Sequence, residues 1–560
     1  MAASDRALHP VVARAYAARG LDATPPLSLD RLLPVSSLGG VAEGAQLLYA
    51  HRRGGGLVIV IGDFDADGAT STALIVRCLR AWGFPRVDFL VPNRFEFGYG
   101  LTPGIVALAA KSSPSLIVTV DNGISSIAGV AAARATGIDV LVTDHHLPGT
   151  QLPDANVIVN PNVPGNGFAS GALAGVGVAF YLMVALRRLL DSAGVLPNGA
   201  PQATTWLDLV ALGTVADLVA LDPNNRVLVS QGLRRIRAGD CVPGIRALLD
   251  IAQRNRLELT AADLGFAVAP RLNAAGRLDD MSIGIRCLLA DSHAEALTLA
   301  ARLDQLNQER RSIEGDMQLQ ALAAVRGLKD PGEAGQSRYG VCLYDAAWHQ
   351  GVVGLVASRI KDRIRRPVVA FADAGEGILR GSARSVAGVH IRDVFDAMAA
   401  RHPELIEKFG GHAMAAGLSL EKSRLDEFAR AFDAEVARWA DQAGQADEIA
   451  TDGELGVDEI ALETAAAVRA AGPWGQGFPE PSFDGEFIIR KSRVIGDKHL
   501  KMWVEVANTR RSFDAIAFNY FTGRDTREAL PESARLVYRL DINEYQGERR
   551  LQLLVDHVLN

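Results

Sequence analysis

Short apolar runs alternate with helical stretches from residue 57 to 220. The runs are LVIVIG, VDFLVP, LIVTV, DVLVT and NVIVN, and helical spacing separates them at about residues 69–82, 104–111 and 124–136. Strands that alternate with helices in this way form parallel sheets. The pattern therefore predicts an α/β fold with a doubly wound parallel sheet.

The pattern changes twice further along the chain. Residues 296–325 contain one glycine and no proline and keep helical apolar spacing, which predicts one long helix bridging two lobes. VCLYD, PVVAFAD and ILRGSARS, with a helix over 351–363, predict a second α/β segment. After about residue 450, short strands alternate with polar turns, which is typical of a small β-barrel of the OB type.

Composition indicates a globular protein, since the chain has 560 residues and is 48% hydrophobic. Its longest apolar stretch, residues 172–186, is shorter than the roughly 20 residues of a membrane span, and its start has no apolar signal region. We therefore expect no membrane association and a cytoplasmic location. The four cysteines form no C-x-x-C pair, which argues against a disulfide framework and a thiolate zinc site.

Three carboxylates follow the first apolar run at alternate positions, where LVIVIG leads into Asp63, Asp65 and Asp67. Such clustered like charges repel one another unless a cation lies among them. A calcium EF-hand loop is excluded, because its twelfth position requires Glu and here holds Leu74. The alternative without a ligand is a solvated acidic turn that caps the next helix.

The same pattern recurs later, where acids or histidines end or interrupt apolar runs. They are Asp121 after LIVTV, Asp144, His145 and His146 after DVLVT, and Asp217 in an apolar helix predicted over 207–221. Because the carboxyl ends of parallel strands line one crevice, we expect these side chains to converge with the three earlier acids.

Several carboxylates with one or two histidines suit Mn²⁺ or Mg²⁺ better than zinc. Two such ions about 4 Å apart would clamp the attacking and leaving oxygens of a phosphoryl displacement and activate water near neutral pH. The chemistry expected at this crevice is therefore metal-assisted phosphodiester hydrolysis with two divalent ions.

These motifs resemble the DHH phosphoesterase superfamily, which is named after the triplet at residues 144–146. The series DFDADG, VDNG, DHH, GTVAD, APRLNAAGRLDD, GSARS and GGHAMAAG is similar, within it, to the RecJ family of bacterial single-stranded-DNA exonucleases. The resemblance covers roughly residues 45–560. It implies an enzyme that degrades single-stranded DNA 5′ to 3′ to mononucleotides, in DNA repair and recombination.

The resemblance also gives the predicted segments their names. They are an N-terminal segment (1–45), a DHH catalytic domain (46–235), a helical region with the long bridging helix (236–335), a DHH-associated domain (336–440) and an OB-like nucleic-acid-binding domain (450–560).

Family resemblance further implies a role for each acid. The first ion would be held by Asp65 and Asp121, with help from Asp63, and the second by Asp67, Asp121, His145 and Asp217. His146 would contact the scissile phosphate. The residues expected to take part in catalysis are therefore Asp63, Asp144 and His146.

Arginine forks and glycine-rich segments are candidates for holding phosphate, because they offer bidentate donors and close backbone approach. The candidates are Arg94, Arg271, Arg277, Ser382, Arg384, Gly410, Gly411 and His412. Surface ion pairs and ligand-free tight turns are the alternatives. Ser382 and Arg384, with Arg94, would bind a terminal 5′-phosphate and so set the polarity of digestion.

The predicted barrel places aromatic residues among basic ones, as in single-strand binding grooves. The aromatics are Trp503, Phe518, Tyr520, Phe521 and Tyr545, of which we expect most to be core and one or two to stack on bases. The net charge of −7 argues weakly against a nucleic-acid partner, but dense basic runs lie at 359–366 and 491–511.

Two other functions use the same residues. One is the same chemistry on a cyclic dinucleotide, a short oligonucleotide or pyrophosphate, but such small substrates need neither the barrel nor the long helix. The other is a non-catalytic replication scaffold, but the set of acids is intact. The expected partners are single-stranded DNA and, from the resemblance, the single-stranded-DNA-binding protein, and we expect a monomer.

Overall fold

The computed structural model describes most of the chain. The described residues are 8–21, 26–92, 96–326, 338–440, 448–496, 498–507, 509–521, 531–545 and 547–559. Contacts divide the chain into two compact units. The first unit comprises residues 1–276, 280–304 and 450–560, and the second comprises residues 277–279 and 305–449.

The first unit contains a five-stranded sheet in the order β2-β1-β3-β4-β5, in which every pair is parallel. Its strands are β1 (Val58–Ile61), β2 (Val87–Leu90), β3 (Leu116–Val120), β4 (Asp139–Thr143) and β5 (Val157–Val159). β1 and β3 are buried throughout, as strands covered on both faces must be.

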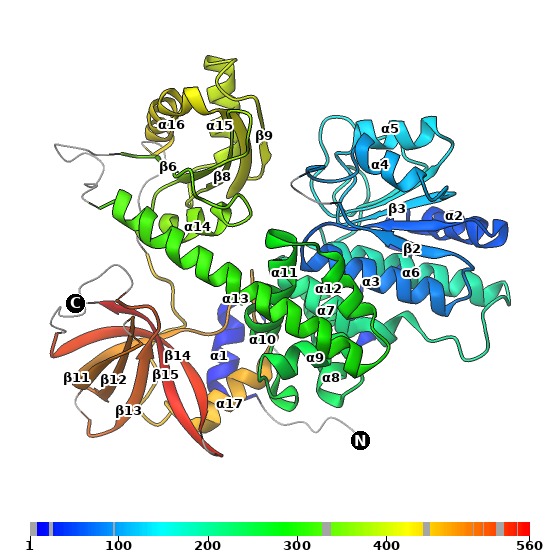
Figure 1. Ribbon diagram of the computed structural model, residues 1–560. Helices are drawn as coiled ribbons and strands as arrows, with labels where there is room; N and C mark the ends of the chain where they lie inside the picture. Colours follow the sequence, from blue (N-terminus) through cyan, green and yellow to red (C-terminus); the bar gives the residue numbers. More distant parts are fainter. Residues whose placement is uncertain are drawn as a thin grey trace. The chain divides into compact units, whose positions relative to one another are not determined.

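Helices cover both faces of this sheet (Figure 1). They are α4 (Pro103–Ala110) and α5 (Ile127–Ala135) on one face, and α2 (Val41–Gly54), α3 (Ala66–Ala81) and α6 (Gly175–Ser192) on the other. Ile105 of α4 and Val130 of α5 share one apolar cluster with Ile117 of β3. The doubly wound parallel sheet predicted from the alternating pattern is confirmed.

Further helices complete this part of the first unit. They are α7 (Leu207–Ala216), α8 (Pro223–Ala238), α9 (Pro243–Ile251), α10 (Ala261–Asp263), a π-helix (Leu264–Val268), α11 (Ala269–Leu278) and α12 (Ser282–Leu289). Among the described residues, no helix combines the length and the apolar character that crossing a membrane requires.

The helix predicted over 207–221 is shorter than expected. α7 ends at Ala216, Asp217 is its C-cap residue, and Leu218 has a φ of 60° and is 71% exposed. The next residues hydrogen-bond elsewhere, since Leu221 N–H donates to Gln476 O and Ala220 O accepts from Asn225 Nδ2. One long-range and one local hydrogen bond thus replace the helical ones, and the helix ends although the apolar pattern continues.

The long helix is confirmed as α13 (His293–Ala324), which has 32 residues. Its residues up to Asp304 belong to the first unit, and those from Gln305 belong to the second. The segment boundaries proposed from the sequence stay a prediction.

The second unit contains a mixed sheet in the order β6-β7-β8-β10-β9, in which only β6 and β7 are parallel. Its strands are β6 (Val341–Tyr344), β7 (Val368–Asp373), β8 (Ile378–Arg384), β9 (Lys408–Gly411) and β10 (Ala415–Glu421). α14 (Val353–Ile364) and the end of α13 pack on one face. α15 (Ile391–Arg401) and α16 (Leu425–Ala440) pack on the other.

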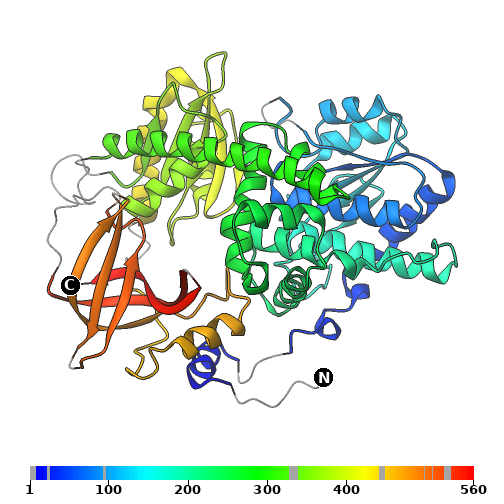
Figure 2. The same cartoon turned by 60° about the horizontal axis from the view of Figure 1, so that its bottom comes forward.

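The last strands form a closed barrel in the order β11-β12-β13-β15-β14, which confirms the predicted OB-like architecture. They are β11 (Phe483–Ile495), β12 (His499–Val506), β13 (Ser512–Ala517), β14 (Ser533–Tyr545) and β15 (Glu548–Leu559). α1 (Pro10–Ala18) and α17 (Leu462–Ala471) lie side by side, blue and gold in Figure 2. Val11 of α1 joins the barrel core.

One glycine shows how tightly the helices of the first unit pack. A Cβ added to Gly232 of α8 would lie 2.2 Å from Leu207 O and 2.4 Å from Ala211 Cβ, both on α7. Gly232→Ala is therefore expected to lower the free energy of unfolding by about 1–3 kcal/mol. At Gly315 of α13 no atom lies within 4 Å of such a Cβ, so Gly315→Ala is the matched control.

The control should raise the free energy of unfolding by about 0.5–1 kcal/mol, because alanine favours helix more than glycine does. Urea unfolding of both variants measures the difference. Equal effects at the two positions would contradict the close packing of α7 and α8.

Candidate metal centre

The acidic side chains gather where the chain reverses direction across the sheet. β1 connects to β2 on one side, whereas β3 leads to β4 and β5 on the other, so β1 and β3 are neighbours at a topological switch point. The crevice outside the carboxyl ends of such strands is where doubly wound sheets bind ligands. Asp121 directly follows β3, and Asp63 lies two residues after the last residue of β1.

The loop after β1 is held by its own acids. Asp65 is the N-cap residue of α3, and its Oδ1 accepts the N–H of Gly68 at 2.9 Å. Asp63 Oδ1 accepts the N–H of Phe64 at 2.7 Å. From α11, Asn273 Oδ1 accepts the N–H of Ala66 at 2.8 Å. The loop is therefore ordered by the protein itself.

Asp67, in the first turn of α3, is buried against the N-terminus of α6. Its carboxylate accepts the N–H groups of Gly175 and Val176 at 2.7 and 2.9 Å, so it faces the positive end of that helix. Burial, followed by the charge of Asp65, nevertheless raises the pKa of Asp67 to about 7. Glycine is required at 175, because a Cβ there would lie 2.8 Å from Asp121 Cβ and 3.0 Å from Asp67 Oδ2.

Asp121 has a strained backbone, with a φ of 61°, and is 2% exposed. Its Oδ1 accepts no hydrogen bond among the described residues, although His145 Nε2 lies 3.0 Å away. Burial, and then the charges of Asp67 and Asp65, raise the pKa of Asp121 well above its ordinary value. The same causes, with burial largest, raise the pKa of Asp217.

In the Asp-His-His segment, Asp144 and His146 are joined by a hydrogen bond. Asp144 is buried, and its carboxylate accepts N–H groups from Ile124 and His145 and the ring Nδ1–H of His146 at 2.7 Å. Burial opposes ionisation of Asp144, but these hydrogen bonds and the charge of His146 hold its pKa below the ordinary value. Burial likewise acts to lower the pKa of His146, but the hydrogen bond to Asp144 and the charges of Asp144, Asp63 and Asp65 together raise it.

The predicted ligands do come together. Three groups have ligand atoms within 4.8 Å of one another: Asp63, Asp65 and Asp121; Asp67, His145 and Asp217; and Asp121, His145 and His146. His145 Nε2 lies 3.4 Å from Asp217 Oδ2 as well as beside Asp121. Asp121 and His145 each belong to two groups, so the three groups form one continuous centre.

These residues fit hard divalent cations. The donors are carboxylate oxygens and imidazole nitrogens, which suit Mn²⁺ or Mg²⁺. Burial, and after it repulsion from neighbouring acids, raises the pKa values of Asp67, Asp121 and Asp217. A buried carboxylate oxygen that accepts no hydrogen bond is the open position that a cation would fill.

The predicted phosphate-binding residues lie in several places. Arg271 Nε pairs with Asp304 Oδ1 at 2.8 Å, and Arg277 Nη1 donates to Gly351 O. Arg94 lies outside the described residues. For Arg271 and Arg277, a phosphate contact stays a prediction.

Ser382 and Arg384 form a compact polar cluster at the end of β8. Arg384 Nη1 donates to Ser382 Oγ at 3.0 Å, and burial lowers the pKa of Arg384. The first turn of α14 lies against them, since a Cβ on Gly354 would be 2.9 Å from Ser382 Oγ and 3.0 Å from Arg384 Nη2. In the same unit, Gly410 and Gly411 end β9, and His412 follows with an exposed side chain.

The sequence reasoning missed Tyr99, which lies in the glycine-rich loop before α4. Its hydroxyl donates to Asp121 O at 3.2 Å and lies 3.4 Å from His146 Nδ1, and its ring contacts His146 and Phe64 edge-on. The motif FGYG carries no periodic pattern that marks it. Two glycines on either side of an aromatic residue were the signal available in the sequence.

Comparisons with known proteins place these residues in a family. Family models match residues 57–214 (DHH family, N-terminal domain), 337–438 (DHHA1 domain) and 451–557 (RecJ OB domain). The chain is 51% identical to a protein of Salmonella typhimurium named single-stranded-DNA-specific exonuclease RecJ, over 98% of this chain and 96% of that protein. The chain belongs to the RecJ family of single-stranded-DNA-specific exonucleases.

Other RecJ proteins are also similar to this chain. The Escherichia coli protein of the same name is 50% identical over 98% of this chain and 96% of its own length. Among solved structures, Thermus thermophilus RecJ in complex with Mn²⁺ matches with a TM-score of 0.80 and 30% identity, covering 99% of this chain and 76% of that one. A RecJ structure bound to manganese matches with a TM-score of 0.61 and 34% identity, covering 74% and 98%.

Repulsion among the acids makes the stability of this RecJ protein depend on pH in the metal-free state. A carboxyl whose pKa is raised by folding binds its proton more tightly in the folded state, so stability is lost as pH rises through the folded pKa. For Asp67 this window runs from about 4, the ordinary carboxyl value, to about 7. In EDTA, the melting temperature of the wild type should therefore fall between pH 5.5 and 8.

Asp121→Asn removes one of the repelling charges. In EDTA at pH 8 this variant should be more stable than the wild type, because folding no longer buries a charged carboxylate at this position. Its stabilisation by Mn²⁺ should be lost. Asp208→Asn, a buried acid of the same unit outside the centre, should keep the Mn²⁺ response. An unchanged pH slope in Asp121→Asn would refute mutual repulsion.

Proposed function

We propose that this exonuclease uses two divalent ions, Mn²⁺ or Mg²⁺, and digests single-stranded DNA from the 5′ end to mononucleotides. The observation that carries the two-ion proposal is the continuity of the ligand groups through Asp121 and His145. Asp65 and Asp121, assisted by Asp63, would hold one ion. Asp67, Asp121, His145 and Asp217 would hold the other.

When bound, such ions supply Lewis-acid activation of water and of the phosphodiester, and neutralise charge that develops during displacement. The protein's own residues organise the site around that chemistry. Asp67 is fixed by the amides of α6, and Asp121 is fixed by the hydroxyl of Tyr99 on its carbonyl. The ligand positions are therefore set mainly by backbone hydrogen bonds.

His146 is the proposed contact to the scissile phosphate. Its Nδ1–H is held by Asp144, whose carboxylate is in turn fixed by backbone N–H groups. Asp144 thereby favours a protonated ring, with Nε2–H left to donate to a phosphate oxygen. The relatives solved with Mn²⁺ or Mg²⁺ support the choice of metals, and the carboxylate and imidazole donors of this chain suit those ions.

Polarity needs a pocket that recognises one end of the strand. A 5′-phosphate carries about one more negative charge than an internal diester and prefers an arginine with free amides. Arg384, Ser382 and the first turn of α14 provide a buried guanidinium, a hydroxyl and a helix N-terminus in contact. We assign the 5′-phosphate to this cluster, with Arg94 and His412 as further predicted contacts.

The barrel is proposed to hold the strand as it feeds toward the metal centre. Cross-strand pairs put Trp503 beside Lys491, and Lys501 beside Arg493, on the outer face of β11 and β12. Trp503 and Phe518 are 45% and 59% exposed, whereas Phe521 is buried in the core. Tyr520 packs partly against that core. The stacking residues are therefore proposed to be Trp503 and Phe518.

Family membership opposes the two alternatives, hydrolysis of small nucleotides and a non-catalytic scaffold. We propose that the enzyme acts as a monomer. We propose a role in DNA repair and recombination in the cytoplasm, since the substrate is formed there. The single-stranded-DNA-binding protein is the proposed protein partner, because it covers the same substrate.

The terminal pocket predicts how Arg384→Ala behaves. On 5′-phosphorylated strands its kcat/KM should fall about tenfold or more, the value of a lost charge-assisted contact, while 5′-hydroxyl strands are little affected. Arg380→Ala, an exposed arginine on the same strand β8, is the control. Both variants are compared with the wild type on end-labelled strands of one sequence.

The result also tests direction. If the wild type digests both kinds of end with equal kcat/KM, or shortens strands from the 3′ end, the assignment of the pocket is wrong. If Arg384→Ala loses the same factor on both ends, the residue is not a terminal-phosphate contact.

The barrel face predicts a loss of single-strand affinity. Trp503→Ala and Phe518→Ala should each weaken binding of a long strand by about 1–3 kcal/mol, as expected for one stacked base, with kcat unchanged at saturation. Leu559→Ala, an exposed apolar residue of β15, is the control. Unchanged binding in the double variant would make this face structural.

A further inference from the structure

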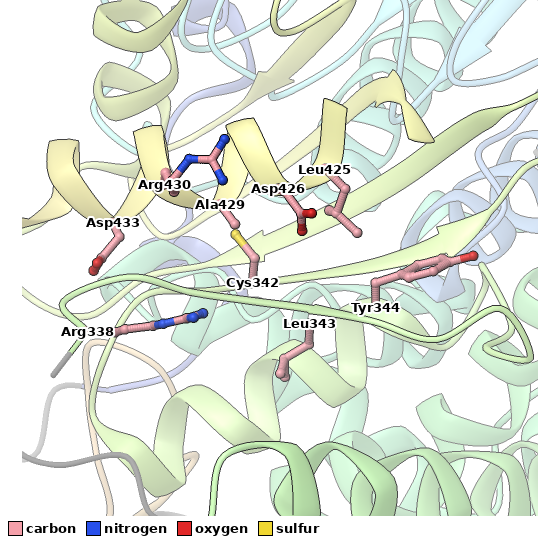
Figure 3. Close-up of a pocket in the computed structure, with 9 residues that line it drawn as sticks. All are labelled: Arg338, Cys342, Leu343, Tyr344, Leu425, Asp426, Ala429, Arg430 and Asp433. Carbon is pink, nitrogen blue, oxygen red and sulfur yellow. The ribbon is translucent and has the colours of Figure 1, made fainter. Parts of the chain in front are cut away.

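A trough lies in the second unit between β6 and α16, and it has a volume of about 470 Å³ (Figure 3). Arg338, Cys342 and Tyr344 line one side of this β6–α16 trough, and Leu425, Ala429 and Arg430 line the other. None of these residues belongs to the metal centre or to the Ser382–Arg384 cluster. The proposed exonuclease mechanism therefore leaves the trough without a function.

One wall of the trough is a free sheet edge. β6 is the outermost strand and pairs only with β7, in parallel. Val341 N–H donates to Pro367 O, so the peptide groups of Cys342 and Tyr344, which alternate with it, face away from β7. Among the described residues, these outward groups have no backbone hydrogen-bond partner. An edge of this kind accepts another extended chain.

The trough has a cationic end. Asp433 on α16 accepts the N–H groups of Tyr339 and Gly340 at 2.7 and 3.0 Å, which anchors the start of β6 and occupies this carboxylate. Arg338 and Arg430 are exposed on either side of the same end, and within the described part of the chain neither forms an ion pair. Two unpaired guanidinium groups therefore flank the start of the free edge.

The opposite end is largely apolar. Leu425 and Tyr344 lie there, away from Arg338 and Asp433 (Figure 3). Asp426 is also at this end, in the first turn of α16, where the helix N-terminus favours an acid. A ligand that follows the trough would therefore meet guanidinium groups at one end and apolar side chains at the other.

We propose that the β6–α16 trough binds an extended segment of a partner protein, which adds a strand to β6, places an acidic side chain between Arg338 and Arg430, and packs an apolar one against Leu425 and Tyr344. Backbone pairing supplies affinity, and the alternating side chains supply selectivity. A nucleic-acid strand fits less well, because phosphates along its whole length would approach Asp426 and Asp433, and it cannot pair with peptide groups.

The test uses the full chain and a labelled pool of eight-residue peptides that alternate aspartate or glutamate with leucine, valine or phenylalanine. Fluorescence anisotropy should show saturable binding. Arg338→Glu combined with Arg430→Glu should weaken it at least about tenfold, because two charge-assisted contacts become repulsive. Ala429→Trp, which fills the trough, should weaken it as well.

Controls separate this site from the rest of the molecule. Arg392→Glu, an exposed arginine on α15, should bind the pool as the wild type does. All variants should digest single-stranded DNA at the wild-type rate, which shows that they are folded and keeps this test independent of the proposed catalytic mechanism. Hydrogen exchange at the amides of Cys342 and Tyr344 should slow when the peptides are added.

Several results would overturn the proposal. They are absence of saturable binding, equal binding of a pool with lysine in place of the acids, unchanged affinity in the double arginine variant, or no protection of the β6 amides. Displacement of the peptides by a single-stranded oligonucleotide, with loss of that displacement in the double variant, would make the trough a DNA contact instead.

Discussion

Electrostatic repulsion among buried acids is the constraint on which this structure depends. Asp67, Asp121 and Asp217 lie together with little access to water, and burial followed by mutual repulsion raises their pKa values. Such an arrangement persists only if the fold holds it rigidly and a cation relieves it. The metal-free fold thus carries an unfavourable electrostatic contribution at neutral pH, which a bound divalent ion would relieve.

The elements that hold these acids rigidly are the strands and helices that form the fold itself. The strand order brings the ends of β1 and β3 together, and the N-terminus of α6 offers two amides to Asp67. Tyr99 fixes the strained peptide of Asp121, and Asp144 fixes His146. The second unit and the barrel contribute separate surfaces: an arginine cluster suited to a phosphate, and an aromatic face suited to bases.

Much of the metal centre was predictable because its signal is local. Asp63, Asp121 and Asp144 stand at the ends of β-branched runs, and a parallel sheet gathers such ends at one edge, so the sequence alone indicates that these acids converge. The end of α7 was not predictable, because the N–H of Leu221 donates to Gln476 O, which is distant in sequence, and a helix whose apolar pattern continues stops there. Tyr99 and the packing of Val11 into the barrel depend on contacts between distant segments, which periodicity does not report.

The central claim is that the acids form one centre for two cations that share a carboxylate. Electron paramagnetic resonance of the full chain titrated with Mn²⁺ tests this directly, since ions about 4 Å apart are magnetically coupled. The account predicts two Mn²⁺ per chain at saturation, with the spectrum of a coupled pair. Saturation at one Mn²⁺ per chain, or two ions with the spectrum of isolated Mn²⁺, would contradict it.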